Sequence, residues 1–259
     1  MGKQKAKILV LVEGSRRETA LMNHLLAIYG IGERHQIVSY NTNIHVLYNS
    51  MFKDEDPNTL DLLQVLKERE KDEVKRAVFD ERFSDILLIF DLDPQDDLYS
   101  ENKIQQMLEF FCESSENGKL YINYPTAESF YHMRTIPDPQ YNLYTVTLNE
   151  LKEKTYKTRV NAESRDHDFR KFAQTKDECD VVILQNVSKA FLITGQSITN
   201  AILPPPATEI LHKQSTKLIT EDCLYVLCTC GFYIIDYNPN LLSDRNDQLE
   251  IKKESDANA

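Results

Sequence analysis

Tryptophan is absent from this chain, and glycine and proline are scarce, with 7 and 9 among 259 residues. These numbers exclude a collagen-like or low-complexity chain, which would be rich in both. No apolar run approaches the ~20 residues that a membrane-spanning helix needs. The residues from Met1 to Lys7 lead directly into a strand-like segment, without the small-residue cleavage site of a secretory signal. We therefore expect a soluble, globular, cytoplasmic protein with no membrane partner.

Positive charge and paired cysteines are lacking as well. The 30 Lys and Arg residues against 41 Asp and Glu residues give a net charge of −11. This balance argues against sequence-independent coating of nucleic acid, but it allows a local basic groove. The five cysteines form no C-x-x-C pair, and Cys228 and Cys230 have no His or Cys partner spaced for zinc. Four of the five lie in apolar stretches, so we expect buried free thiols.

What the sequence does contain is an alternation of strand and helix patterns. Apolar runs at residues 7–12 and 85–90, with further strand patterns at 35–40 and 119–123, predict strands of a buried sheet. Helical patterns lie between them at residues 15–28, 60–66 and 104–111. Ser15 and Glu18 form a capping box at the start of the first helix. The alternation predicts an α/β fold, with a mostly parallel sheet flanked by helices.

The pattern changes near residue 135, where Pro137 and Pro139 interrupt the chain. Helical spacing dominates afterwards, at residues 181–198 and 210–218, whereas the run 224–235 fits either a strand or a helix. The tail after Leu242 is polar and is expected to fray. We predict one domain over residues 1–135 and a mainly helical C-terminal lobe over residues 136–259.

Acidic residues follow the predicted strands. Glu13 comes after the first strand, Asp91 and Asp93 come after the central one, and Glu128 comes just past the fourth. The carboxyl ends of parallel strands share one edge of the sheet, where functional groups collect. Like-charged carboxylates ~5 Å apart repel by about 3 kcal/mol at an effective dielectric of ~20, and a hard divalent cation removes that cost. The pattern predicts Mg²⁺ or Mn²⁺ bound by these oxygens, with Asp91 and Asp93 sharing a face of an extended chain.

Each of these residues also has an ordinary structural explanation. Glu13-Gly14 after a strand is commonly a turn, and the acidic loop after residue 91 could cap a helix or lie in solvent. Glu128 alone would be a helix-start residue that neutralises the helix dipole. The combination in this order favours the metal site over these separate explanations.

The same residues resemble a known family. An apolar strand ending in Glu13-Gly14, followed by a strand ending in Asp91-x-Asp93, is similar to the Toprim domain of topoisomerases, primases and nucleases. The segment from Asn123 through Pro125 to Glu128 resembles the Asn-Pro-x-x-Glu element of RloB-like Toprim proteins, relatives of the OLD-type nucleases of bacterial phage defence. The resemblance covers about residues 7–135, roughly half of the chain.

The resemblance implies a Mg²⁺-dependent phosphodiesterase. Glu13 would be an acid/base or a metal ligand, Asp91 and Asp93 would be metal ligands, and Glu128 a further ligand. Related nucleases place a lysine near the reacting phosphate, a position that Lys157 or Lys119 could fill. Pro94-Gln95 and the lack of a firmly assigned lysine depart from the pattern, and a chain of this kind could bind metal yet cleave poorly.

Basic residues could meet the phosphates of a substrate. Arg16 and Arg17 lie at the start of the first predicted helix, beside Glu13, where helix amides already favour anions. A second basic stretch, which could equally be ordinary surface charge, consists of Lys152, Lys154, Lys157 and Arg159 with Tyr156 between them. Among the histidines, only His132, four residues after Glu128, is a candidate for the site.

The leading hypothesis is a metal-dependent endonuclease that acts on DNA or RNA as an anti-phage defence effector. A first alternative is a non-catalytic Toprim module that binds a partner ATPase or a scaffold. A second is a haloacid-dehalogenase-like phosphatase, because the run ending in Asp91-Leu92-Asp93 resembles the first motif of that family. That family has Thr or Val where this chain has Gln95, which disfavours it. Self-association of the chain is left open.

Overall fold

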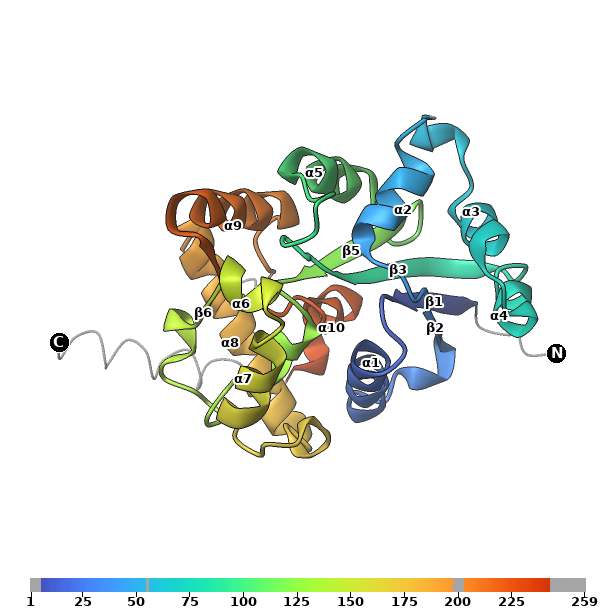
Figure 1. Ribbon diagram of the computed structural model, residues 1–259. Coiled ribbons are helices and arrows are strands. Elements are labelled where there is room, and N and C mark those ends of the chain that lie inside the picture. The colour runs from blue at the N-terminus through green and yellow to red at the C-terminus, as the bar shows by residue number, and fades with distance from the viewer. Residues whose placement is uncertain (1–5, 55, 198–202, 243–259) are drawn as a thin grey trace.

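The computed structural model describes residues 6–54, 56–197 and 203–242. Within these ranges the centre of the fold is a five-stranded sheet in the order β2-β1-β3-β5-β4 (Figure 1). β4 pairs antiparallel with β5, and the other neighbouring strands are parallel. The predicted α/β class with a mostly parallel sheet is therefore confirmed. The strands are β1 (Lys7–Val12), β2 (His35–Ser39), β3 (Phe83–Asp91), β4 (Cys112–Glu113) and β5 (Gly118–Asn123).

The central strands are apolar because both faces of the sheet are covered. Residues 8–12 of β1 and 87–90 of β3 are buried, as continuous apolar runs predict for a doubly covered sheet. The register places Val12 beside Ile89 and Asp91 beside Asn123. The carboxyl ends of β1, β3 and β5 therefore lie at one edge of the sheet. β4 was not predicted, because two residues are too few to produce a strand pattern.

Helices cover both faces of this sheet. Figure 1 shows α2 and α5 on one face, and α1 and α10 on the other. α2 was missed in the sequence, whereas α3 lies on the helical pattern predicted at residues 60–66, and α4 lies in the charged stretch that follows. The bounds are α1 (Arg17–Ile28), α2 (Ile44–Met51), α3 (Leu62–Arg69), α4 (Glu73–Val78), α5 (Glu101–Phe110) and α10 (Phe232–Tyr237).

Most of the described residues after 135 lie beside β5 (Figure 1). A two-stranded antiparallel sheet of β6 (Thr145–Thr147) and β7 (Cys223–Tyr225) lies among its helices. The run 224–235, which fitted either a strand or a helix, contains both, because it begins in β7 and ends in α10. The remaining α-helices are α6 (Leu148–Lys152), α7 (Tyr156–Glu163), α8 (Lys176–Thr194) and α9 (Ala207–Glu221).

Backbone hydrogen bonds join the two parts of the chain. The amide of Tyr124 donates to the carbonyl of Leu227, and the amide of Leu227 donates back, both over 2.8 Å. The boundary at residue 135 stays a prediction. Short 3₁₀ helices complete the fold at Gly32–Arg34, Pro57–Thr59, Ala127–Tyr131, Tyr141–Leu143, Phe169–Lys171 and Pro239–Leu241.

Two further predictions can be compared with the described residues. All five cysteines are free thiols, and four are buried as expected, whereas Cys112 is exposed. Within the described ranges, no helix has both the length and the apolar character needed to cross a lipid bilayer. The prediction for the polar tail falls on residues 243–259, which lie outside the described residues.

Candidate functional site

The carboxyl edge of the sheet opens into a cleft of about 660 Å³. The loop between β1 and α1, the loop after β3, the start of the 3₁₀ helix Ala127–Tyr131 and the region around α6 and α7 line it. The four carboxylates singled out in the sequence all lie in this lining, namely Glu13, Asp91, Asp93 and Glu128. Their convergence follows from the strand register, because β1, β3 and β5 end side by side.

Glu13 and Asp91 are fixed by the backbone at the strand ends. The amide of Asp91 donates a hydrogen bond to Glu13 Oε2 over 3.2 Å. Asp91 is only 3% exposed, and its Oδ1 accepts from the Ala127 amide at 2.8 Å and from Asn123 Nδ2 at 3.4 Å. No described residue donates a hydrogen bond to Asp91 Oδ2. One oxygen of this carboxylate is thus held by the protein, and the other is available to a ligand in the cleft.

Asp93 reaches the cleft by a different route from the one predicted. β3 ends at Asp91, and Asp93 has a φ of +46°. The two aspartates therefore do not share a face of an extended chain, and that expectation was wrong. Aspartate tolerates the left-handed region better than most residues. Gln95 Nε2 donates to Asp93 Oδ1 over 3.0 Å, and His45 Nε2 lies 3.3 Å from the Asp93 carbonyl oxygen.

Glu128 is the most heavily engaged of the four carboxylates. Its side chain is 1% exposed, and its Oε2 accepts from Thr126 Oγ1 over 2.6 Å. Its Oε1 lies 3.4 Å from Arg17 Nε and 3.2 Å from Lys157 Nζ. Two basic residues predicted to contact a phosphate therefore meet one of the predicted metal ligands.

A fifth carboxylate was misread in the sequence. The predicted capping box of Ser15 and Glu18 is absent, because α1 begins at Arg17 and its N-cap, Arg16, makes no side-chain cap hydrogen bond. Glu18 is 7% exposed and lines the cleft. A Cβ atom added to Gly14 would lie 2.4 Å from Glu18 Oε2, so glycine permits this close approach. The Ser-x-x-Glu spacing is common to caps and to other helix starts, and nothing in the local pattern separates the two.

The crowded carboxylates perturb one another. Burial, followed by the charge of Asp93, raises the pKa of Glu13 to about 8. Burial also raises the pKa of Glu18. The pKa of Asp91 is raised well above its ordinary value by burial and then by the charges of Glu13 and Glu128. Such perturbation at several carboxyl groups in one cleft is typical of functional sites, and structural ion pairs can also produce it.

The remaining basic candidates separate into two groups. Arg16, Lys154 and Lys157 line the cleft together with Arg17. Lys119 does not, because it lies at the opposite end of β5, where its Nζ is 2.7 Å from Asp236 Oδ2. Of the two lysines considered for a reacting phosphate, only Lys157 is therefore in position.

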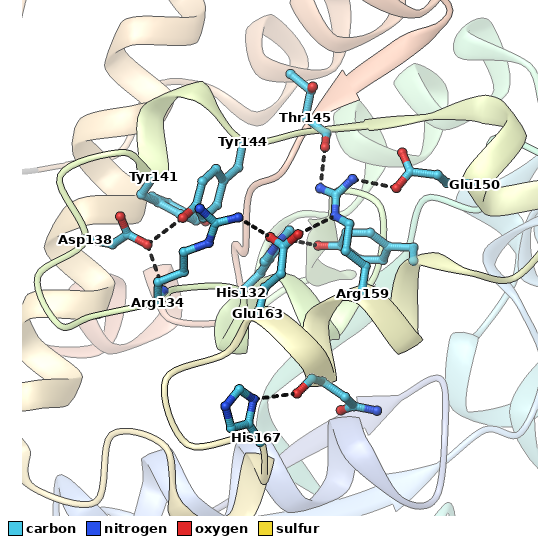
Figure 2. A network of polar contacts seen from close by, with 12 residues as sticks. His132, Arg134, Asp138, Tyr141, Tyr144, Thr145, Glu150, Arg159, Glu163 and His167 are labelled. Carbon is cyan, nitrogen blue, oxygen red and sulfur yellow. Dashed lines mark hydrogen bonds and ion pairs between the residues drawn. The ribbon is translucent and has the colours of Figure 1, made fainter.

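His132 does not line the cleft. Figure 2 shows His132, Arg134 and Arg159 around Glu163. His132 Nε2 and Arg134 Nη2 lie 3.1 and 3.2 Å from Glu163 Oε2. Burial of the His132 ring lowers its pKa to about 4, and the hydrogen bond to Glu163 offsets only part of that effect. Arg159 also belongs to this network, with its Nη1 2.5 Å from Glu150 Oε1. The network supports the fold beside the cleft, and Glu150, which it includes, also lines the cleft.

The donor chemistry of the cleft fits a hard divalent cation. Glu13, Asp91 and Asp93 offer oxygen atoms only, which suits Mg²⁺ or Mn²⁺ and disfavours zinc. Across the described ranges, no three side chains of His, Cys, Asp or Glu already stand close enough together to hold an ion. Coordination by the three carboxylates therefore requires side-chain rotation within the cleft.

Comparisons with protein-family models, with curated proteins and with solved structures gave no match to this chain. The chemistry of the cleft is therefore the basis for assigning a function.

Proposed function

We propose that this chain is a Mg²⁺- or Mn²⁺-dependent nuclease that hydrolyses phosphodiester bonds of DNA or RNA. The observation that supports the proposal most is the meeting of Glu13, Asp91 and Asp93 in one cleft, at the ends of neighbouring strands. Carboxylates with raised pKa values lose their mutual repulsion when a cation binds among them. The Toprim-like order of these residues in the sequence supports the same function.

The roles of individual residues follow from their contacts. Glu13, Asp91 and Asp93 would hold the ion, and a cation there would polarise a phosphoryl oxygen and lower the pKa of a bound water. Arg16, at the uncapped start of α1, is exposed at the rim of the cleft and is suited to a neighbouring phosphate. Glu128 as a further metal ligand stays a prediction. The resemblance to RloB-like proteins is the ground for proposing a role in defence against phage.

The decisive test compares Asp91→Asn with Asp97→Asn. Both substitutions replace a carboxyl group with an amide in the acidic segment that begins at the last residue of β3, but Asp97 is exposed and does not line the cleft. We expect the wild type and Asp97→Asn to cleave DNA or RNA when Mn²⁺ or Mg²⁺ is added. Asp91→Asn should lose at least about 100-fold in rate, since even the outer partners of metal ligands contribute 10–100-fold. Equal cleavage by both variants, or cleavage in the presence of EDTA, would contradict the proposal.

One observation favours a second candidate, a non-catalytic module that binds a partner ATPase or another protein. The charge of Glu128 is already balanced by Arg17 and Lys157, so part of the acidic cluster is stable without a cation. Titration calorimetry with Mn²⁺, run beside the cleavage assay, separates the candidates. Metal binding without cleavage of either nucleic acid would favour the module.

A further inference from the structure

Both oxygens of Glu128 are engaged before any ligand enters the cleft. Thr126 Oγ1 donates to Oε2, while Arg17 Nε and Lys157 Nζ both approach Oε1. A divalent cation at Oε1 would lie beside two positive charges, and one at Oε2 would displace the Thr126 hydroxyl. These contacts make Glu128 a poor metal ligand, in contrast to Asp91, which has an oxygen without a hydrogen bond.

Arg17 is held in one orientation by contacts on several sides. Its Nη2 donates to Asn161 Oδ1 over 3.3 Å, and its guanidinium lies over the Phe169 ring, 4.9 Å from the centroid. Nε forms the ion pair with Glu128, whereas Nη1 is buried and has no hydrogen-bond partner among the described residues. A buried donor without a partner is costly, and an anionic oxygen at this side of the guanidinium would satisfy it.

Lys157 also pairs with Glu128, and its side chain is accessible to solvent. Its side chain is 54% exposed, and it comes from α7, on the other side of Glu128 from α1. Burial lowers the pKa of Lys157, but the carboxylates of Glu128 and Asp91 more than offset this, so its pKa is raised. The ammonium is therefore charged. Two cations and one carboxylate leave the group with a net charge of +1, next to the carboxylates proposed to bind metal.

We propose that Arg17 and Lys157 form a binding site for a phosphate group of the nucleic-acid backbone, and that Glu128 is the positioning residue that holds both cations in place. This inference rests on the proposed nuclease function, and it assigns to Glu128 a role different from that of a metal ligand. A planar guanidinium and a point-charge ammonium on one shared anchor suit the two non-bridging oxygens of a phosphodiester.

Binding without metal tests the site separately from catalysis. A short fluorescein-labelled single-stranded DNA and its RNA counterpart are titrated with the chain in EDTA, and anisotropy is measured. We expect Arg17→Ala and Lys157→Ala each to weaken binding by about tenfold, and to reduce the dependence on salt by about one phosphate contact. Lys152→Ala is the matched control, because Lys152 is an exposed lysine near Lys157 that does not line the cleft. It should bind as the wild type does.

Glu128→Gln is the more decisive variant, because a charge-balancing role and a positioning role of Glu128 predict opposite changes in oligonucleotide affinity. Removing a carboxylate makes the cleft more positive. If Glu128 only balanced charge, the variant protein would therefore bind oligonucleotide more tightly than the wild type. A positioning residue predicts binding about tenfold weaker, and no further loss when Glu128→Gln is added to the Arg17→Ala, Lys157→Ala double variant. The control is Asp236→Asn, which removes a carboxylate that also contacts one lysine and one hydroxyl, those of Lys119 and Tyr121.

Calorimetry with Mn²⁺ distinguishes the two roles of Glu128. We expect Glu128→Gln to leave the Mn²⁺ affinity within about twofold of the wild type, whereas the loss of a ligand would weaken it by tenfold or more. Tighter oligonucleotide binding by Glu128→Gln, unchanged binding by Lys157→Ala, or a large loss of Mn²⁺ affinity would each overturn the inference. A wild type that binds oligonucleotide through these residues but never cleaves it would refute the nuclease proposal and retain the phosphate site.

Discussion

The backbone amide of Asp91, the last residue of β3, donates a hydrogen bond to the side chain of Glu13, the first residue after β1. This contact is possible because β1 and β3 are neighbouring parallel strands. Their register sets Val12 beside Ile89, so the two strands end at the same edge of the sheet. The amide fixes Glu13 Oε2 at the edge of the cleft, where burial and the charge of Asp93 raise the pKa of Glu13 to about 8. A cation bound there would favour the charged form of this carboxylate, and several measurable consequences follow.

Asp93→Asn should stabilise the protein when no divalent cation is present. The charge of Asp93 is one cause of the raised pKa of Glu13, so removing it relieves repulsion worth about 1 kcal/mol. Asparagine also tolerates the positive φ at this position and can still accept from Gln95. Thermal unfolding in EDTA, followed by circular dichroism, should show a higher melting temperature than the wild type. Asp97→Asn should leave it unchanged, and a lower melting temperature for Asp93→Asn would identify the carboxylate as a structural cap.

Asn123→Asp should be strongly destabilising, because Asn123 connects the C-terminal segment to the acidic cluster. Its Oδ1 accepts from the Thr229 amide at 3.2 Å and from the thiols of Cys228 and Cys230 at 3.4 and 3.2 Å. Its Nδ2 donates to Asp91. A buried carboxylate here would face Asp91 without that donor, at a cost of about 3–5 kcal/mol in the free energy of unfolding. Urea denaturation measures the loss.

The control for that substitution is Asn117→Asp, which makes the same chemical change at an exposed turn before β5. It should alter the free energy of unfolding by no more than about 0.5 kcal/mol. If both variants were equally stable, the Asn123 side chain would have no part in joining the two regions.

Gly231→Ala should weaken the packing of α10 against α8. A Cβ atom at position 231 would lie 2.7 Å from Ile183 Cγ1, closer than carbon atoms approach, and Ile183 is buried in the core. We expect a loss of about 1–3 kcal/mol in the free energy of unfolding, the usual cost of overpacking. Ile183→Ala should cost less in the Gly231→Ala background than in the wild type, since the cavity would accommodate the added methyl group. Strict additivity of the two losses would argue against direct contact.

The contribution of His132 to stability should fall as the pH is lowered from about 6.5 to about 4. Its pKa is lowered from 6.5 to about 4 in the folded state, so the unfolded chain binds more protons in this window. The stabilisation by neutral His132 is complete above the unfolded pKa and is lost towards the folded one, by about 3 kcal/mol in total. The groups around the ring include Tyr156, Glu163, Arg159 and Lys189.

Chemical denaturation at a series of pH values measures this slope. The lowered pKa of Glu163 adds to the loss only near and below its ordinary value of 4.5. The raised pKa values of Glu13, Asp91 and Glu18 act in the opposite direction over this range, and the lowered pKa of His35 acts in the same direction as that of His132. The contribution of His132 is therefore the difference in slope between the wild type and a His132 variant. As the pH falls from 6.5 to 5, the wild type should lose stability relative to His132→Gln, and an unchanged slope in that variant would contradict the assignment. Circular dichroism is the suitable signal, because the chain has no tryptophan.

The candidate site was foreseen in part. The place of Glu13, Asp91 and Asp93 in the site could be predicted because each stands at or just past the end of an apolar strand. Strands that are buried on both faces are recognisable in a sequence as continuous apolar runs. The capping box at Ser15 failed because a helix start with that spacing does not require the cap to form. Asp93 reaches the cleft through a left-handed residue, and no residue-type preference at that position would have predicted the turn.

The sequence by itself determined the alternation of the longer strands with helices and the acidic residues at the strand ends, because hydrophobic periodicity and chain order are local properties. Only the tertiary structure decided which atoms those carboxylates meet. Glu128 contacts residues 17 and 157, and Asn123 contacts residues 228–230. These partners are far apart in the chain, and their meeting depends on how α1, α7 and the C-terminal segment pack around the sheet, which no local pattern encodes.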